Sequence, residues 1–281
     1  MPASEKLKAL VNEIPEPAKN GTYVDMDSGK IERIDKVVLE LRKGGRDSVL
    51  GLIDLLVEPG KGDDKAHFAL HVLAVRVSAP GGDKARAEFA RAVASRLAGD
   101  RPTAVRKYLI DQLQVAGGKE VVGALGKALL DPELCDPAAR ALAAIRDGAA
   151  EQLLAALPKV KGRSRLSVLK KLAVLRANGA AEAFKKALAD DDPDVRIAAA
   201  WGITRIADAS GAAALLKAAD AHKGWERINQ TDACMALAEA LLAAGKKAEA
   251  AGVFAHLKKT RTDAADSHVR QAAARGLTAA T

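Results

Sequence analysis

The chain alternates amphipathic stretches with short Gly- and Pro-containing breaks, a pattern that predicts a series of helices. Residues Ile31, Ile34, Val37, Val38 and Leu41, for example, recur at intervals of three and four, which places them on one helix face. No stretch shows the sustained alternation of Val, Ile, Thr and aromatics typical of strands. Helices are predicted over residues 4–14, 31–42, 46–57, 64–77, 83–98, 102–116, 119–130, 137–145, 149–157, 164–176, 180–189, 193–207, 211–221, 226–244, 248–258 and 265–280.

One segment of the chain repeats itself. Residues 191–203 and 266–277 both carry an Asp, then Val-Arg, small residues, Gly and a large aliphatic seven residues after the Arg. With Ile203 as the reference, the equivalent positions, here called the anchors, are Val72, Leu113, Leu142, Leu172, Ile203, Leu237 and Leu277. A self-similarity of roughly thirty to forty residues indicates a repeat architecture, in which the anchors face the core.

The position seven residues before each anchor is mostly basic. It holds Lys65, Arg106, Cys135, Arg165, Arg196, Gln230 and Arg270. We predict that Arg106, Arg165, Arg196 and Arg270 are structural ties between repeats, together with acidic residues such as Asp194. The Cys and the Gln are expected to interrupt this ladder.

The run Pro193-Asp194-Val195-Arg196, an Ala-rich amphipathic helix, and then a second helix resemble HEAT repeats, in particular the bacterial phycobilisome-lyase-type subset. The resemblance covers roughly residues 60–281. It implies antiparallel helix pairs stacked into a right-handed superhelix, with the second helix of each pair lining the concave side. It implies no single activity, because the family is defined by its architecture.

The predicted fold class is therefore all-α, an α-α superhelix of about six to seven helical pairs with an N-terminal helical cap. Residues 1–43 do not fit the repeat and are predicted to form the cap, since terminal units of a solenoid are usually atypical. Residues 44–281 are predicted to form one continuous solenoid. The aromatic content of only 3% fits closely stacked, Ala-rich helices. For the last helix, self-sealing, continuation into further residues and pairing with another subunit remain open.

A candidate partner surface follows from the position two residues before each anchor, which holds Leu70, Asp111, Arg140, Lys170, Trp201, Met235 and Arg275. A residue two positions from a core-facing one is rotated by about 200° on a helix and points outward. Trp, Met and Arg are enriched at protein-binding hot spots. We predict a partner-binding strip, called the predicted strip below, of Arg140, Lys170, Trp201, Arg205, Met235 and Arg275 on the concave side. The alternative is that Trp201 packs onto the adjoining repeat.

Signatures of catalysis are absent from the sequence. It has no phosphate-binding Gly-rich loop, no Gly-x-Ser-x-Gly elbow, no Cys-x-x-Cys pair and no His-Glu dipeptide. His67 and His71 lie four apart with Asp63 and Asp64 upstream, a set that could bind a divalent metal but that we interpret as a polar stripe. We therefore predict no catalytic residue, metal, cofactor or small-molecule substrate.

The net charge and the cysteines narrow the possible functions only slightly. The net charge of +8 permits an anionic partner such as nucleic acid, yet the basic residues are spread without a run of five. Cys135 and Cys234 lie in different repeats, so we expect free thiols that serve as small helix-contact residues. Because the sequence shows no leader and no membrane-length apolar run, we expect a cytoplasmic protein without a membrane partner.

The resulting hypothesis is a non-enzymatic helical-repeat scaffold that binds a protein or peptide on its concave surface. Two alternatives remain. One is a nucleic-acid-binding protein that uses a basic concave strip, and the other is an accessory subunit of a lyase-type enzyme.

Overall fold

The computed structural model describes residues 3–17, 23, 27–58 and 61–281, and within them every regular element is helical. The predicted all-α fold is confirmed. The chain forms two compact units, Met1–Gln152 and Leu153–Thr281. The division falls within α9 (Ala149–Ala156).

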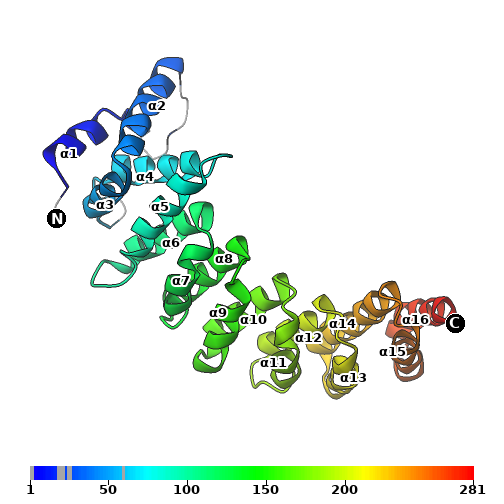
Figure 1. Cartoon of the computed structure of the whole chain (residues 1–281). Coiled ribbons are helices and arrows are strands. Elements are labelled where there is room, and N and C mark those ends of the chain that lie inside the picture. Colours follow the sequence, from blue (N-terminus) through cyan, green and yellow to red (C-terminus); the bar gives the residue numbers. More distant parts are fainter. Residues whose placement is uncertain (1–2, 18–22, 24–26, 59–60) are drawn as a thin grey trace. The chain divides into compact units, whose positions relative to one another are not determined.

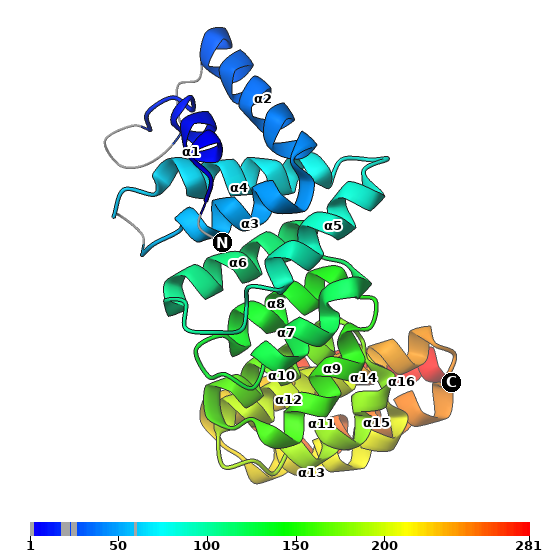
Figure 2. The ribbon, with the colours of Figure 1, turned by 60° about the vertical axis from the view of Figure 1, so that its left-hand side comes forward.

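Besides the start of α9, the described residues of the first unit form eight α-helices and one 3-10 turn. These are α1 (Glu5–Asn12), α2 (Ser28–Lys43), α3 (Gly45–Leu55), α4 (Asp64–Val77), α5 (Asp83–Ala94), α6 (Thr103–Ala116), η1 (Lys119–Val121), α7 (Val122–Ala128) and α8 (Cys135–Ile145). Helix α6 packs between α4 and α8, while α5 packs against α3 (Figure 2). Helices α1 and α2 both pack on α3 and α4. A separate cap over residues 1–43 remains a prediction.

The second unit has seven helices in two rows. The first row consists of α10 (Gly162–Val174), α12 (Pro193–Arg205), α14 (Gly224–Ala243) and α16 (Ser267–Ala280). The other row consists of α11 (Ala181–Ala187), α13 (Ala212–Ala221) and α15 (Lys247–Thr260). Figure 1 shows α11, α13 and α15 side by side on one flank of this unit, with α10, α12 and α14 on the other. Each helix of the first row packs against the next one in that row.

Most anchors occupy the core as predicted. Leu113, Leu142, Leu172, Ile203 and Leu237 are fully buried. The two terminal anchors are not, since Val72 and Leu277 are only half-buried. In α4 the buried residue is Leu73 instead, with Ala69 and Leu70 a turn earlier, so the alignment of the first repeat was wrong by one residue. This shift also explains why Leu70, predicted to point outward, is completely buried.

A second periodic feature is the turn that follows the helices α8, α10 and α12. Arg146, Arg176 and Ala207 each lie four residues after an anchor and adopt positive φ angles of 68°, 52° and 50°. After α10 and α12 the next amide reaches back to the anchor carbonyl, from Ala177 to Leu172 at 3.1 Å and from Asp208 to Ile203 at 3.2 Å. This is the left-handed helix end usually made with Gly. The positive φ angle recurs after all three helices, whereas the bond from the next amide back to the anchor carbonyl is present only after α10 and α12.

Close helix packing in the second unit depends on Gly at one repeated position. Gly202 of α12 faces the ring of Phe184 on α11, and a Cβ at residue 202 would lie 2.4–2.6 Å from that ring. Gly276 of α16 repeats the arrangement, since its Cβ would lie 2.5–2.7 Å from the ring of Phe254 on α15. Both Phe side chains are buried. A side chain at residue 202 or 276 would therefore push the two helices apart.

Helix boundaries differ from the predicted ones mainly at two places. The helix predicted over 83–98 ends at Ala94, and residues 95–97 form a tight turn in which the Leu97 amide bonds Ala94. The helix predicted over 119–130 begins as the 3-10 turn η1 directly after Gly117-Gly118. The tighter 3-10 form is common at helix ends.

The Gly–Phe packing gives a direct test of the fold. We expect Gly202→Ala to destabilise the second unit by about 1–3 kcal/mol, because the added methyl overpacks a full core site. Gly252→Ala on α15 is the matched control, since no atom lies within 4 Å of its added Cβ. That variant should gain up to about 1 kcal/mol from helix propensity. Urea unfolding followed by circular dichroism measures both, and equal stability of the two variants would contradict the close approach.

Candidate partner-binding surface

Trp201 is held on the outer face of α12 by the way this helix starts and packs. The Asp192 carboxylate caps the helix by accepting a bond from the Asp194 amide at 2.9 Å, and Pro193 occupies the first turn. Ala199 and Ile203 turn into the core, which directs Trp201 outward with 40% of its surface exposed. The Arg205 guanidinium carbon lies 5.8 Å from the centre of the indole ring, within cation–π range.

The large exposed apolar side chains of the second unit all lie on the first row of helices. They are Val174 on α10, Trp201 on α12, and Trp225 and Ile228 on α14. Within residues 153–281, which the structure describes completely, helices α11, α13 and α15 carry none. Trp225 is the most exposed, at 71%. Because apolar side chains of this size gather on one row, that row is the candidate contact surface.

The pairing of α12 with α14 places Trp201 and Ile228 at similar levels along the two helix axes. The Thr204 hydroxyl donates to the Ala233 carbonyl at 3.0 Å, and Arg196 pairs with Glu226. Trp201 lies between Arg196 and Thr204 on its helix, so it is level with the turn of α14 between residues 226 and 233. That turn carries Ile228. We call Trp201, Arg205 and Ile228, with Trp225 about one turn before Ile228, the α12–α14 patch.

The predicted strip is only partly assembled by direct contact. Trp201 and Arg205 lie together. Lys170 on α10 and Arg275 on α16 are exposed on the same row, and Met235 on α14 is half-buried. Arg140 belongs to the first unit, where it is exposed on α8 within 3.5 Å of Asp111 and 3.4 Å of Asp136.

Sequence reasoning missed Trp225 and Ile228. They lie near the start of α14, which begins at Gly224, two residues before the predicted start. Their three-residue spacing on a helix, with a polar residue on either side, was the available signal.

The four arginines predicted as ties all bridge chain segments. Arg196 makes the most bonds: Nε and Nη2 donate to the two carboxylate oxygens of Glu226 at 2.5 and 2.7 Å, and Nη1 donates to the Asp190 and Asp191 carbonyls. Arg106 donates to the Leu97 carbonyl and the Asp131 carboxylate, Arg165 pairs with Asp190, and Arg270 donates to the Arg261 and Asp263 carbonyls. Arg106, Arg196 and Arg270 thus donate to carbonyls at or just beyond the end of a neighbouring helix, whereas Arg165 pairs with a carboxylate.

Asp194 has a different place from the one predicted. Its backbone amide bonds to the Asp192 cap and its side chain is exposed at the start of α12. The carboxylate that pairs with Arg196 is Glu226, thirty residues further on. Since α14 is a neighbour in space but not in sequence, local spacing could not identify this partner.

The Gln at position 230 replaces the ladder arginine with another network. Gln230 is buried and donates to Glu226 at 3.1 Å, while His222 Nδ1 lies 3.0 Å from its side-chain oxygen. The tie to the start of α16 is made by Arg227 instead, whose guanidinium donates to both carboxylate oxygens of Asp266. The ladder predicted to be interrupted here is therefore continued by a neighbouring residue.

Paired carboxylates in these ties have lowered pKa values. The hydrogen bond from Arg196 lowers the pKa of Glu226, and burial opposes this only in part. The bond from Arg227 likewise lowers the pKa of Asp266. Both carboxylates are held in the charged form by a guanidinium.

Comparison with protein families identifies one helix pair of the second unit. The sequence model of the HEAT repeat family matches residues 181–210, which contain α11 and α12. Residues 181–210 are a HEAT repeat. The match begins one helix earlier than the repeat predicted from the sequence. Helix α12, which carries Trp201, is therefore the second helix of the matched pair.

Two solved structures of distant sequence are similar to this chain. One is the complex of CpcE and CpcF of phycocyanin lyase from Nostoc sp. PCC7120, with 16% identity, a TM-score of 0.42, and coverage of 84% of this chain and 94% of that chain. Another is an engineered protein with 20% identity, a TM-score of 0.31, and coverage of 99% of this chain and 97% of that one. A comparison with curated proteins finds no match.

Outside the HEAT repeat, the histidines of α4 lie in a hydrogen-bonded polar cluster. His67 Nδ1 lies 2.8 Å from Asp63, His71 Nδ1 lies 3.0 Å from Gln112, and the Tyr108 hydroxyl donates to the His67 carbonyl. Among the described residues no three His, Cys, Asp or Glu side chains are grouped as metal ligands would be. The imidazoles bond to side chains of their own unit.

The two cysteines are free and buried. Burial raises the pKa of the Cys234 thiol to about 12, so the thiol is protonated at neutral pH.

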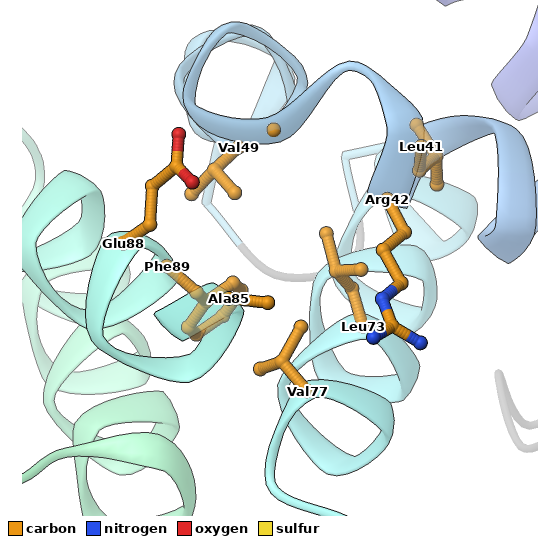
Figure 3. A pocket seen from close by; sticks show the side chains of 9 residues that line it. Leu41, Arg42, Val49, Leu73, Val77, Ala85, Glu88 and Phe89 are labelled. Carbon is orange, nitrogen blue, oxygen red and sulfur yellow. The ribbon is translucent and has the colours of Figure 1, made fainter. Parts of the chain in front are cut away.

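The first unit contains two hollows lined by described residues. One, of about 30 Å³, lies among α2, α3, α4 and α5, where Figure 3 shows Glu88 and Arg42 on opposite sides of Leu73, Val77 and Phe89. It is far smaller than the ~150 Å³ cavity that accepts benzene. The other, of about 460 Å³, lies between α1 and the start of α4. Its lining residues Pro17 and Gly62 border segments outside the described residues, and we assign no ligand to it.

No helix in the described part of the chain has both the length and the apolar character needed to cross a bilayer.

The Arg196 tie predicts a large stability effect. Arg196→Ala should lower the free energy of unfolding by about 2–4 kcal/mol, because Glu226 and two carbonyls then lose their donor in a largely buried site. Arg140→Ala is the control: its ion pairs are exposed, so its loss should cost about 1 kcal/mol or less. Urea denaturation of both variants measures the difference, and a comparable small loss for both would contradict the structural role of Arg196.

The lowered pKa of Glu226 predicts acid sensitivity. A carboxyl with a folded pKa below its usual value of 4.5 contributes stability that is complete above that value and is lost as the pH falls through the folded pKa. Stability should therefore decrease below about pH 4.5. Glu226→Gln should be less stable at pH 7 but flatter between pH 5 and pH 3. Urea midpoints at a series of pH values test this, and an unchanged slope in the variant would be the contrary result.

Proposed function

We propose that this chain is a non-enzymatic HEAT-like scaffold that binds a protein or peptide partner through the first-row helices of its second unit. The observation that carries the proposal is the gathering of Val174, Trp201, Trp225 and Ile228 on that row, while the other row of the same unit has no large exposed apolar side chain. Exposed aromatic side chains next to Arg are typical of protein contact surfaces. The resemblance to HEAT repeats also favours this row, since the second helix of a pair lines the binding side.

The distribution of charge favours a protein partner over nucleic acid. Nucleic-acid binding relies on cations that are free to approach phosphates. Much of the positive charge in this chain is held in internal ion pairs, by Arg86, Arg101, Arg106, Arg165, Arg196, Arg227 and Arg261. Each pair also neutralises one acidic side chain, so the net charge of +8 is unchanged, but these guanidinium groups are not free to approach a phosphate backbone.

The proposal predicts which substitutions abolish partner capture. From an extract of the source cells treated with nuclease, the intact chain should retain specific proteins, and Trp201→Ala/Trp225→Ala should lose them. Leu39→Ala/Leu130→Ala is the matched control, since these residues are similarly exposed but lie in the first unit. Quantitative mass spectrometry compares the three samples.

Two outcomes would contradict the proposal. One is an identical set of proteins retained by both double variants. The other is retention that disappears on nuclease treatment together with salt-dependent binding of a DNA or RNA duplex, which would indicate the nucleic-acid alternative.

A further inference from the structure

We propose, on the basis of the function above, that the partner segment is acidic as well as apolar: it docks a carboxylate on Arg205 and an aliphatic or aromatic side chain between Trp201 and Ile228. The structural basis is an unpaired guanidinium that lies over an exposed indole.

Arg205 differs from the arginines that tie the first-row helices together. Arg163 and Arg275 of the same row also form no ion pair within residues 153–281, but they are exposed, whereas Arg205 is half-buried. Arg165, Arg196, Arg227 and Arg270 are all engaged by carboxylates or carbonyls of neighbouring helices. Arg205 forms no ion pair within residues 153–281, and its Nε is buried without an acceptor. A guanidinium without a partner in a half-buried position is ready for a carboxylate, which it binds with two parallel hydrogen bonds.

Stacking on Trp201 fixes where that carboxylate would bind. The guanidinium lies 5.8 Å from the ring centre, so the indole restricts the side chain of Arg205 and leaves its edge as the donor. A side chain held by stacking loses less freedom on binding than a free one.

Charges beside the patch give it a polarity. Lys170 on the adjacent helix α10 is exposed and forms no ion pair within the second unit, which is described completely. Asp232 on α14 is also exposed. A partner carboxylate is therefore attracted toward the α10 side and repelled from the α14 side, whereas the apolar side chains Ile228 and Trp225 lie on α14. The patch fits a segment with an acidic end near Arg205 and an apolar end near Ile228.

The decisive experiment is a selection of random peptides displayed on phage, using the intact chain as the immobilised target. We expect enriched sequences that combine Asp or Glu with a large apolar residue a few positions away. The same library selected on Arg205→Glu should lose the acidic preference and enrich Lys or Arg at that position. Lys217→Glu on α13 is the matched control, because it makes the same charge change on an exposed residue of the other row.

Binding of a synthesised enriched peptide can be followed by intrinsic fluorescence. The two tryptophans of the chain, Trp201 and Trp225, both lie in the α12–α14 patch, so a change in emission reports on this surface. Affinity should fall on the order of tenfold or more in Arg205→Glu and recover when the acidic residue of the peptide is changed to Lys. Circular dichroism confirms that each variant is folded.

The outcomes separate the inference from the proposed function. Peptides that bind the patch without an acidic preference, or whose affinity is equal for the intact chain and Arg205→Glu, would overturn the inference and leave the scaffold function intact. Enrichment that survives Trp201→Ala/Trp225→Ala would overturn the location of the site. Absence of any enriched peptide, together with unchanged protein capture in that double variant, would overturn both.

Discussion

The interaction on which the packing of the repeats depends is the bond between an arginine at the start of one helix and the carbonyls that end another. The last carbonyls of a helix have no intrahelical donor, and when they are shielded from water they need one. Arg270 supplies it at the C-cap of α15, and Arg106 and Arg196 supply it to carbonyls of the turns that follow α5 and α11. The same side chain of Arg106 or Arg196 also reaches a carboxylate of the next repeat. One residue thus closes its own repeat and positions the following one.

This constraint explains why small residues can fill so much of the second unit. Ala and Gly bury little area each, so the helices gain from packing only when they approach closely. Gly202 and Gly276 permit that approach against Phe184 and Phe254. The arginine ties hold the helix ends in the register that this contact needs. Large aromatic side chains are therefore not needed in every layer, and Trp201 and Trp225 lie at the surface instead.

Much of the architecture could be predicted from periodicity, whereas the surface could be predicted only in part. The anchors from Leu113 to Leu237 are buried as expected because each follows the same helical pattern. The anchor Val72 was wrong by one residue, because two large aliphatic residues are adjacent in α4 and Leu73 takes the core position. Trp201 and Arg205 were predicted from their place beside an anchor. Trp225 was missed because α14 begins two residues before its predicted start. The pairing of Arg196 with Glu226 was missed because it depends on how α14 lies against α12, which the sequence of one repeat does not contain.

The left-handed residues Arg146, Arg176 and Ala207 have a consequence for how this chain can be altered. A non-Gly residue in that conformation costs about 1–2 kcal/mol relative to a right-handed one, and Gly removes most of this penalty while making the unfolded chain more disordered. The three turns lie outside both the apolar core and the α12–α14 patch. They are equivalent turns, so substitutions there can change the stability of the protein one repeat at a time without altering the α12–α14 patch.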